Sequence, residues 1–239
     1  MIRVYHTSDL HDHRGIAPRL KTLRAEQPGL LFDCGDSLRG SQTVYHRSEP
    51  IISEIDDAQY DAQAMGNREF HYLFGCVRAR AAKMHHPFVC SNLVDTRART
   101  LPFLRSHTIH DNGTPVHLIG LLVVQYPQES AWERFFGWRF LDPIETAREA
   151  ASRIPAGEPF IVLSHLGLRT DRKLAAAVPG ISLLLGGHSH DTLRTPEIVA
   201  GVPIVHAGPY GRYVSHSELE MSDGRWSLQS FSLLPLLAA

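Results

Sequence analysis

One stretch of the chain, residues 181–190, constrains the fold more than any other. Its largely apolar run Ile181–Leu185 predicts a buried strand that stops at Gly186–Gly187. His188 and His190 follow, one residue apart, and an extended backbone there would place both side chains on the same side. Taken alone, such a pair is more often found in a surface turn, so the rest of the chain has to decide its meaning.

Four other predicted strand ends carry side chains of a compatible kind. They are Asp9 with His11, which alternate along a segment that we expect to be extended, and Asp36, Asn67 and His165. Each has an ordinary explanation by itself, such as a turn residue, an exposed histidine or a helix N-cap. Carboxylates, imidazoles and amide oxygens are also the ligands that divalent cations take from proteins. Their repeated position after strands therefore predicts one dinuclear metal site.

Strand-like and helix-like segments alternate along the chain, which favours an α/β architecture. The predicted strands cover residues 2–7, 30–34, 60–65, 88–92, 116–122, 160–163, 181–185, 202–206, 216–221 and 226–233. The predicted helices cover residues 18–27, 50–59, 75–84, 144–153 and 171–178. Residues 124–138 show no clear period, and we interpret them as a packed excursion or a lip over the site, with packing favoured for most of their aromatic side chains. Open α/β sheets bind ligands just beyond their strand ends, where the candidate ligands fall.

Composition limits the class of protein. The 239 residues suffice for one α/β domain, and 43% hydrophobic with 21% charged residues is ordinary for a soluble chain. A net charge of -1 gives no general attraction for nucleic acid or an anionic membrane, and no apolar stretch has the length of a bilayer span. A strand predicted from Ile2 leaves no room for a signal peptide, and three cysteines without metal-type spacing do not suggest a disulfide framework. We expect a cytoplasmic protein with buried thiols.

Several short motifs resemble those of the calcineurin-like metallophosphoesterases. They are Asp9-x-His11, Gly35-Asp36-x-x-x-Gly40, Gly66-Asn67-x-Glu69, Ser164-His165 and Gly187-His188-x-His190. Longer segments are most similar to the catalytic domain of the 5′-nucleotidase branch, namely His6–His11, Asn67–Phe70, Ser164–Gly167 and Ala207–Tyr213. Together these segments extend over essentially the whole chain.

The resemblance implies a four-layer αββα sandwich with two divalent cations, Mn, Fe or Zn, on loops at one edge of the sheets. It assigns one cation to Asp9, His11, Asp36 and His190, and the other to Asp36, Asn67, His165 and His188. Asp36 would bridge the two, and a bridging hydroxide would attack the phosphorus in line. Two cations about 3.5–4 Å apart stabilise both ends of such a displacement.

The chain departs from the family pattern at two positions. Arg68 stands where the family usually has a catalytic His, and His71 stands where it usually has the partner Asp. A guanidinium does not donate a proton near neutrality, but it can hold a phosphoryl oxygen. His71 is either the replacement acid or a solvent-facing helix residue. Arg39 and Tyr210 are further candidates for contact with substrate, whereas Glu69 is better explained as structural.

These observations predict a phosphoesterase that acts on a small phosphate ester, with Asn67, Arg68 and His71 as its catalytic residues. A phosphomonoesterase similar to 5′-nucleotidases is favoured. The alternatives are a phosphodiesterase acting on a cyclic nucleotide or other diester, and a catalytically silent scaffold. We expect residues 1–239 to form one catalytic domain without the C-terminal nucleoside-binding domain of many 5′-nucleotidases. We expect no membrane or nucleic-acid partner, and the sequence leaves the oligomeric state open.

Overall fold

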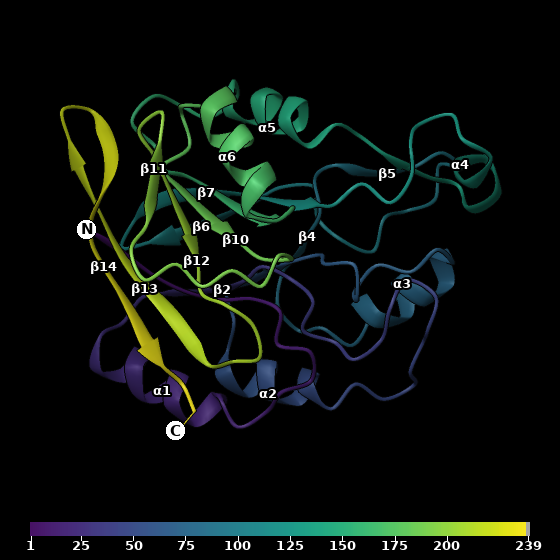
Figure 1. Cartoon of the computed structure of the whole chain (residues 1–239), viewed down its shortest axis with the longest axis horizontal. Helices are drawn as coiled ribbons and strands as arrows, with labels where there is room; N and C mark the ends of the chain where they lie inside the picture. The colour runs from purple at the N-terminus through teal and green to yellow at the C-terminus, as the bar shows by residue number, and fades with distance from the viewer. Residues whose placement is uncertain (238–239) are drawn as a thin grey trace.

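Two six-stranded sheets packed face to face form the centre of the protein (Figure 1). The computed structural model describes residues 1–237. The first sheet has the order β14 (Arg225–Pro235), β13 (Tyr213–Ser222), β1 (Ile2–Thr7), β2 (Leu30–Asp33), β3 (Ala62–Ala64) and β4 (Phe88–Val89). The second has the order β11 (Glu197–Val199), β12 (Val202–His206), β10 (Leu183–Gly186), β9 (Phe160–His165), β7 (Thr114–Leu122) and β6 (His107–Asp111). A small separate sheet pairs β5 (Leu93–Asp95) with β8 (Trp138–Phe140).

Helices cover the outer face of each large sheet. In Figure 1, α1 (Ala17–Glu26) and α2 (Ile51–Ala58) lie below the sheets, and α5 (Pro143–Ala151) and α6 (Leu168–Ala177) lie above them. The helices α3 (Phe74–Ala81) and α4 (Ala131–Phe136) lie at the end of the molecule away from the N-terminus. The predicted four-layer αββα sandwich is therefore confirmed.

The layer between the sheets is a continuous apolar core. Val4, Phe32, Leu163 and Leu185 belong to it, and none of these side chains is exposed to solvent. Strands that are covered on both faces need apolar residues at successive positions rather than in alternation. This explains why the central strands could be predicted from short apolar runs in the sequence.

The central strands of both sheets run parallel, and this brings the candidate ligands together. β1, β2, β3 and β4 are parallel neighbours in the first sheet, as are β7, β9, β10 and β12 in the second. The carboxyl ends of parallel strands meet at one edge of a sheet. The segments that follow β1, β2, β3, β9 and β10 therefore converge at the same edge of the sandwich.

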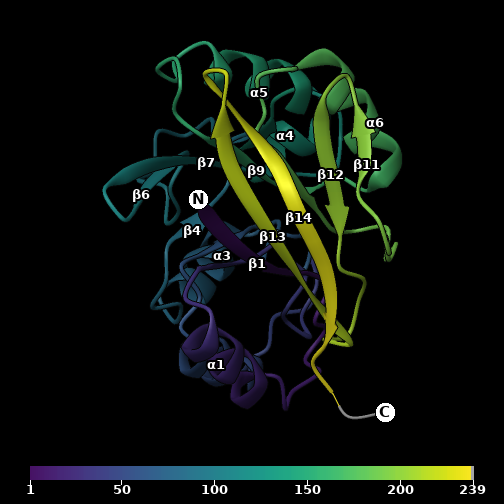
Figure 2. The same ribbon diagram turned by 90° about the vertical axis from the view of Figure 1, so that its left-hand side faces the viewer.

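Antiparallel strands complete the edges of the sheets. Figure 2 shows β13 and β14 as a long hairpin, and β13 pairs antiparallel with β1. β6 and β11 pair antiparallel at the two edges of the second sheet. These two strands, together with β5, β8 and α4, are absent from the sequence prediction.

The irregular segment 124–138 contains α4, which begins after the N-cap Ser130, whose hydroxyl accepts the N–H of Glu133. Trp138 is fully buried, as packing of this segment requires. Trp132 and Phe135 are instead 57% and 68% exposed, so the packing interpretation is wrong for these two. A helix of six residues has only one face to bury, which leaves the aromatic residues on its other face in solvent.

Two further sequence-based expectations concern thiols and membranes. Cys34 and Cys90 are buried and Cys76 is partly buried, and all three are free thiols. Within residues 1–237, none of the helices combines the length and the apolar character needed to cross a bilayer.

Candidate metal centre

The turns after β1 and β2 hold the two central carboxylates in an unusual backbone conformation. Asp9 and Asp36 have φ values of 53° and 59°, in the left-handed region. The N–H of Asp9 donates to the carbonyl of Gly35 (2.8 Å), and the N–H of His11 donates to the carbonyl of Asp36 (3.0 Å). Each turn therefore fixes the other, because a left-handed residue other than glycine persists only where its surroundings hold it.

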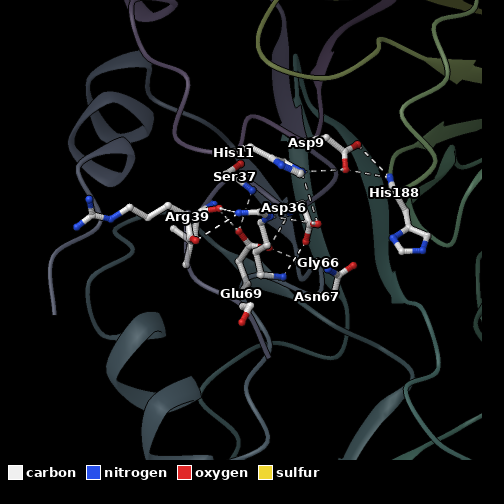
Figure 3. A network of polar contacts seen from close by, with 12 residues as sticks. Asp9, His11, Asp36, Ser37, Arg39, Gly66, Asn67, Glu69 and His188 are labelled. Atoms are coloured by element: carbon white, nitrogen blue, oxygen red, sulfur yellow. Dashed lines mark hydrogen bonds and ion pairs between the residues drawn. The ribbon is translucent and has the colours of Figure 1, made fainter. Parts of the chain in front are cut away.

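Glu69 supports the turn that carries Asp36. This side chain is fully buried, and each of its carboxylate oxygens accepts two backbone N–H groups. The four donors are the N–H groups of Asp36, Ser37, Leu38 and Gly66, at 2.8–3.1 Å (Figure 3). The structural interpretation of Glu69 is confirmed by these bonds. Its pKa is raised by burial and by the nearby Asp36.

Close packing of two glycines lets the turns after β2 and β3 approach each other. A Cβ atom on Gly66 would lie 2.3 Å from the backbone nitrogen of Asp36, and one on Gly35 would lie 2.5 Å from the nitrogen of Gly66. Side chains at either position would separate the two turns. Asn67, directly after Gly66, is thereby placed beside Asp36.

A first cluster contains Asp9, His11 and His190. Oδ1 of Asp9 lies 3.8 Å from Nε2 of His11 and 3.5 Å from Nε2 of His190. The potential ligand atoms of these three residues all lie within 4.8 Å of one another. The backbone N–H of His188 donates to both oxygens of Asp9, which ties the turn after β10 to the turn after β1 (Figure 3).

A second cluster contains Asp36 and His165, with Asn67 beside them. Nε2 of His165 lies 3.3 Å from Oδ1 of Asp36 and 3.1 Å from Oδ1 of Asn67. Asp9, Asp36 and His165 form a second group whose potential ligand atoms lie within 4.8 Å of one another. The ring of His188 packs against the ring of His165, with centroids 5.0 Å apart.

The local geometry of the histidines differs from the sequence prediction. We expected Asp9 and His11, and likewise His188 and His190, to reach the site from extended segments. Both pairs instead have positive φ values, 53° and 50° in the first pair and 74° and 59° in the second. The two histidines after β10 consequently separate: His188 packs on His165 in the second cluster, and His190 packs on His11 in the first.

The buried carboxylates of the site stabilise positive charge beside them. Although burial opposes ionisation, the His165 imidazole lowers the pKa of Asp36 to about 2. Burial also opposes protonation of His165, yet Asp36 outweighs it and raises the pKa of His165 to about 9. Burial lowers the pKa of His188, with His165 adding to the effect. The carboxylates thus stabilise the positive charge of protonated His165, and a divalent cation bound in this cluster would supply positive charge in its place.

The donor set fits such a cation. Nδ1 of His165 donates to the carbonyl oxygen of Cys34 (2.7 Å). Nε2 faces oxygens of Asn67 and Asp36, so this nitrogen must carry either a proton or a cation. Nε2 of His11 is buried and has no hydrogen-bond partner within residues 1–237. Separations of 3.3–3.8 Å between these nitrogens and the carboxylate oxygens resemble the distances between neighbouring ligands on one cation, roughly 3–3.5 Å for bonds of about 2.1 Å.

Arg68 lies at the edge of the second cluster. Its backbone N–H donates to Oδ1 of Asp36 (2.7 Å), and its guanidinium Nε lies 3.9 Å from Oδ2 of the same carboxylate. The guanidinium also donates to the carbonyls of Leu38 and Arg39. Arg68 therefore places a permanent positive charge beside the carboxylate that lies between the clusters.

His71 is buried, so its alternative interpretation as a solvent-facing helix residue is wrong: it precedes α3 and is only 5% exposed. Its Nδ1 accepts the N–H of Leu73 (3.0 Å), which places the ring proton on Nε2. Burial, with the charge of Arg80, lowers the pKa of His71. The ring is neutral at pH 7, which makes it a weak acid, and its catalytic role stays a prediction.

The two remaining substrate candidates differ in position. The side chain of Arg39 points away from Asp9 and His188 and donates to the carbonyl of Ser48 (Figure 3). Tyr210 lies against the first cluster, with its ring 5.5 Å from those of His11 and His190, and its N–H donates to the carbonyl of Asp9 (2.8 Å). Tyr210 therefore adjoins the site, whereas Arg39 does not face it.

Sequence reasoning missed two buried networks that hold the ligand-bearing strands. Asp33 accepts hydrogen bonds from Thr7, Ser37, Gln63 and the N–H of Gly35, and burial raises its pKa to about 7. In the second sheet, Asp171 accepts from the hydroxyl of Ser164 and bonds to Nε2 of His206. A carboxylate within the apolar run of β2 was the available signal for Asp33, because buried carboxylates need partners.

Comparison with known sequences gives a consistent result. A sequence model described as calcineurin-like phosphoesterase matches residues 2–192. An uncharacterized metallophosphoesterase of Bacillus subtilis, YunD, is 30% identical over 96% of this chain and 52% of its own. A 5′-nucleotidase of Vibrio cholerae is 24% identical over 98% of this chain and 51% of its own. The chain spans about half the length of these curated relatives.

Solved structures share the fold at low sequence identity. A 5′-nucleotidase precursor from Thermus thermophilus superposes with a TM-score of 0.82 at 24% identity, over 98% of this chain and 54% of that one. The sulfate thiohydrolase SoxB from a Thermus species superposes with a TM-score of 0.78 at 18% identity, over 99% of this chain and 57% of that one. Since the fold carries hydrolases of different substrates, the fold alone does not identify a substrate.

Proposed function

Because this chain belongs to the calcineurin-like phosphoesterase family, we propose that it is a dinuclear metal-dependent phosphoesterase that hydrolyses a small phosphate monoester. Asp9, His11, Asp36 and His190 would hold one cation. Asp36, Asn67, His165 and His188 would hold the other. The nitrogen and oxygen donors suit Mn, Fe or Zn. When bound, two such cations lower the pKa of a water molecule and stabilise an in-line displacement at phosphorus.

The position of Asp36 between the two clusters carries this proposal. Its Oδ1 lies 3.3 Å from Nε2 of His165, and its Oδ2 lies 3.7 Å from Nε2 of His11. One carboxylate thus presents a different oxygen to a histidine of each cluster. Asp9 is also common to both candidate ligand groups, so the two clusters adjoin rather than forming separate sites.

Residues around the clusters would act on the substrate directly. The guanidinium of Arg68, which is partly exposed beside Asp36, would hold a phosphoryl oxygen and neutralise charge that develops during displacement. The amide of Asn67 is a second candidate for such a contact. Tyr210 would form part of the rim, because it packs against both histidines of the first cluster.

A phosphodiesterase is the second candidate, and Arg68 is the observation that favours it. A guanidinium stabilises charge without donating a proton, so it suits a leaving group that departs without protonation. Burial lowers the pKa of His71, so its ring is mostly unprotonated at pH 7 and has no imidazolium proton to supply. Activated diesters and aryl esters have such leaving groups, whereas alkyl monoesters do not.

The decisive variant is Asp36→Asn, compared with His11→Ala and with Asp12→Asn as the matched control. Asp12 is an acidic residue of the same turn as Asp9, and its Oδ1 accepts the N–H of Ile51, outside both clusters. We expect Asp36→Asn to abolish turnover of 4-nitrophenyl phosphate and to lower the metal content below that of His11→Ala, because it removes a ligand of both cations.

Metal content per chain, measured by mass spectrometry on purified protein, separates the outcomes. About two cations per chain in the native protein and in Asp12→Asn supports the proposal. An Asp36→Asn protein that retains two cations and normal turnover contradicts the bridging role. A native protein that binds no cation and hydrolyses no ester supports a silent scaffold instead.

A further inference from the structure

An aromatic groove adjoins the end of the molecule that carries α4. It has a volume of about 460 Å³ and is lined by Thr43, Tyr72, Gln125, Tyr126, Pro127, Trp132 and Phe136. None of these residues carries a charge at neutral pH. Ligand pockets of about 300–1,000 Å³ with mostly apolar and aromatic walls are typical of small-molecule sites, so the groove has the size and character of one.

The rings of the groove are stacked on one another. The ring of Phe136 stacks with that of Tyr72, with centroids 4.8 Å apart and an interplanar angle of 17°, and with that of Trp132, at 5.8 Å and 7°. Tyr72 also stacks with Tyr126, with centroids 6.2 Å apart. Trp132 is 57% exposed, although its ring is held parallel to that of Phe136. An exposed ring at the end of an ordered stack offers a flat apolar surface for another planar group.

The groove wall is joined to the metal centre through short stretches of backbone. The N–H of Val123 donates to the carbonyl of His165 (3.1 Å), and Gln125 follows two residues later, about 7 Å away at most. On the other side, Tyr72 directly follows His71 in the segment that begins with Asn67. Both walls of the groove are therefore connected by short segments of chain to residues of the candidate metal centre.

Hydrogen bonds of Gln42 connect the two walls of the groove. The side-chain amide of Gln42 donates to Oε1 of Gln125 (3.1 Å), and the carbonyl of Gln42 accepts the N–H of Tyr72 (3.1 Å). These bonds join the loop after β2 to both walls of the groove. A ligand in the groove would meet the side-chain amide of Gln125 as well as aromatic rings.

We propose that this groove binds the planar aromatic part of the substrate's leaving group, such as a nucleobase or an aryl ring, by stacking on the Trp132–Phe136–Tyr72 rings. The inference rests on the proposed function, because it extends the substrate outward from the phosphate site. An uncharged groove offers the phosphate no cationic partner to replace its hydration, so the apolar end of the substrate is favoured there. The enzyme then prefers phosphate esters whose leaving group carries a planar ring to esters of plain sugars.

The first experiment measures binding without catalysis. Adenosine, which has no phosphate, is titrated by calorimetry into the native protein, Trp132→Ala, Trp132→Tyr and Phe135→Ala. Phe135 is the matched control, because it belongs to the same helix and is 68% exposed but does not line the groove. We expect binding to native protein and Phe135→Ala, a loss of about 5- to 100-fold in Trp132→Ala, and recovery in Trp132→Tyr, as for loss of one stacking ring.

The second experiment compares substrates. Trp132→Ala is expected to raise KM for adenosine monophosphate and 4-nitrophenyl phosphate while kcat and the turnover of ribose 5-phosphate stay unchanged. If KM rises for adenosine monophosphate alone, the groove is specific for a nucleobase. If KM rises for both substrates, the groove accepts any planar ring. Equal adenosine binding in Trp132→Ala and native protein overturns the inference, as does a concentration-dependent dimer in sedimentation that Trp132→Ala abolishes. Adenosine binding in a protein without esterase activity would refute the proposed function but leave the groove intact.

Discussion

The substitution Glu69→Gln tests how the carboxylate network holds the metal-centre turns. Each oxygen of Glu69 accepts two backbone N–H groups, and the amide of glutamine can replace only one of these oxygens. Two buried N–H groups then face an NH₂ group instead of an acceptor. At about 1–3 kcal/mol for each unsatisfied group, we expect a loss of about 2–6 kcal/mol in the free energy of unfolding. This is a large part of the roughly 5–15 kcal/mol typical of a folded protein.

Glu49→Gln is the matched control for this prediction. Glu49 is also buried, at 6% exposure, but it accepts one backbone N–H, from Arg39, and its other oxygen has no partner within residues 1–237. The amide oxygen of glutamine can keep that single bond, so the loss is expected to be smaller. Urea denaturation followed by circular dichroism at pH 7 measures both variants, with equal m-values as the check that the unfolded states are comparable.

A loss below about 0.5 kcal/mol for Glu69→Gln would refute this reasoning, since it lies within the range of ordinary surface substitutions. It would also have a definite physical meaning. The pKa of Glu69 is raised by burial and by Asp36, and a carboxyl group that is already protonated in the folded protein closely resembles an amide. The network would then be held by a neutral acid, and the stability of the native protein would fall as the pH rises through that pKa.

Three further predictions concern protons, charge and metal. Burial lowers the pKa of His6 from its usual 6.5 to about 3, so its contribution to stability is present above pH 6.5 and is lost as the pH falls, by up to about 1.4 kcal/mol per pH unit. Urea denaturation between pH 7 and 4 is expected to show a flatter pH profile for His6→Asn. Arg68→Ala is expected to lose about 2–4 kcal/mol of transition-state stabilisation with both aryl and alkyl esters, and Arg68→His is expected to flatten the dependence of rate on leaving-group pKa. If that dependence is shallow in the native protein and becomes steep only in His71→Ala, the acid is His71. Chelation is expected to remove activity and added Mn²⁺ to restore it, with turnover falling below neutral pH as protons compete for the histidines; unchanged turnover in protein verified to be free of metal would exclude this chemistry.

The central strands could be predicted because burial on both faces leaves a direct record in the sequence. The run Leu30–Asp33 is fully buried and was recognised from its apolar residues, with the boundary in error by one residue. β6 and β11 pair on only one side, so their polar and apolar residues follow no strong pattern. The six-residue α4 is too short to establish a helical period, and its exposed aromatic residues gave a misleading signal of burial.

The residue types of the candidate metal centre could be predicted from the sequence, but the backbone conformations that orient their side chains could not. His188 and His190 reach different clusters because both adopt left-handed backbone conformations, which cost about 1–2 kcal/mol for residues other than glycine. What offsets that cost is distant in the sequence: Asp9 accepts the N–H of His188, and the N–H of Tyr210 bonds to the carbonyl of Asp9. A local pattern cannot report a conformation that is stabilised by partners about 180 and 200 residues away. The spacing of the motif therefore identifies which side chains converge, and the family resemblance divides the two histidines between the clusters, whereas the packing of the two sheets is the physical cause of that division.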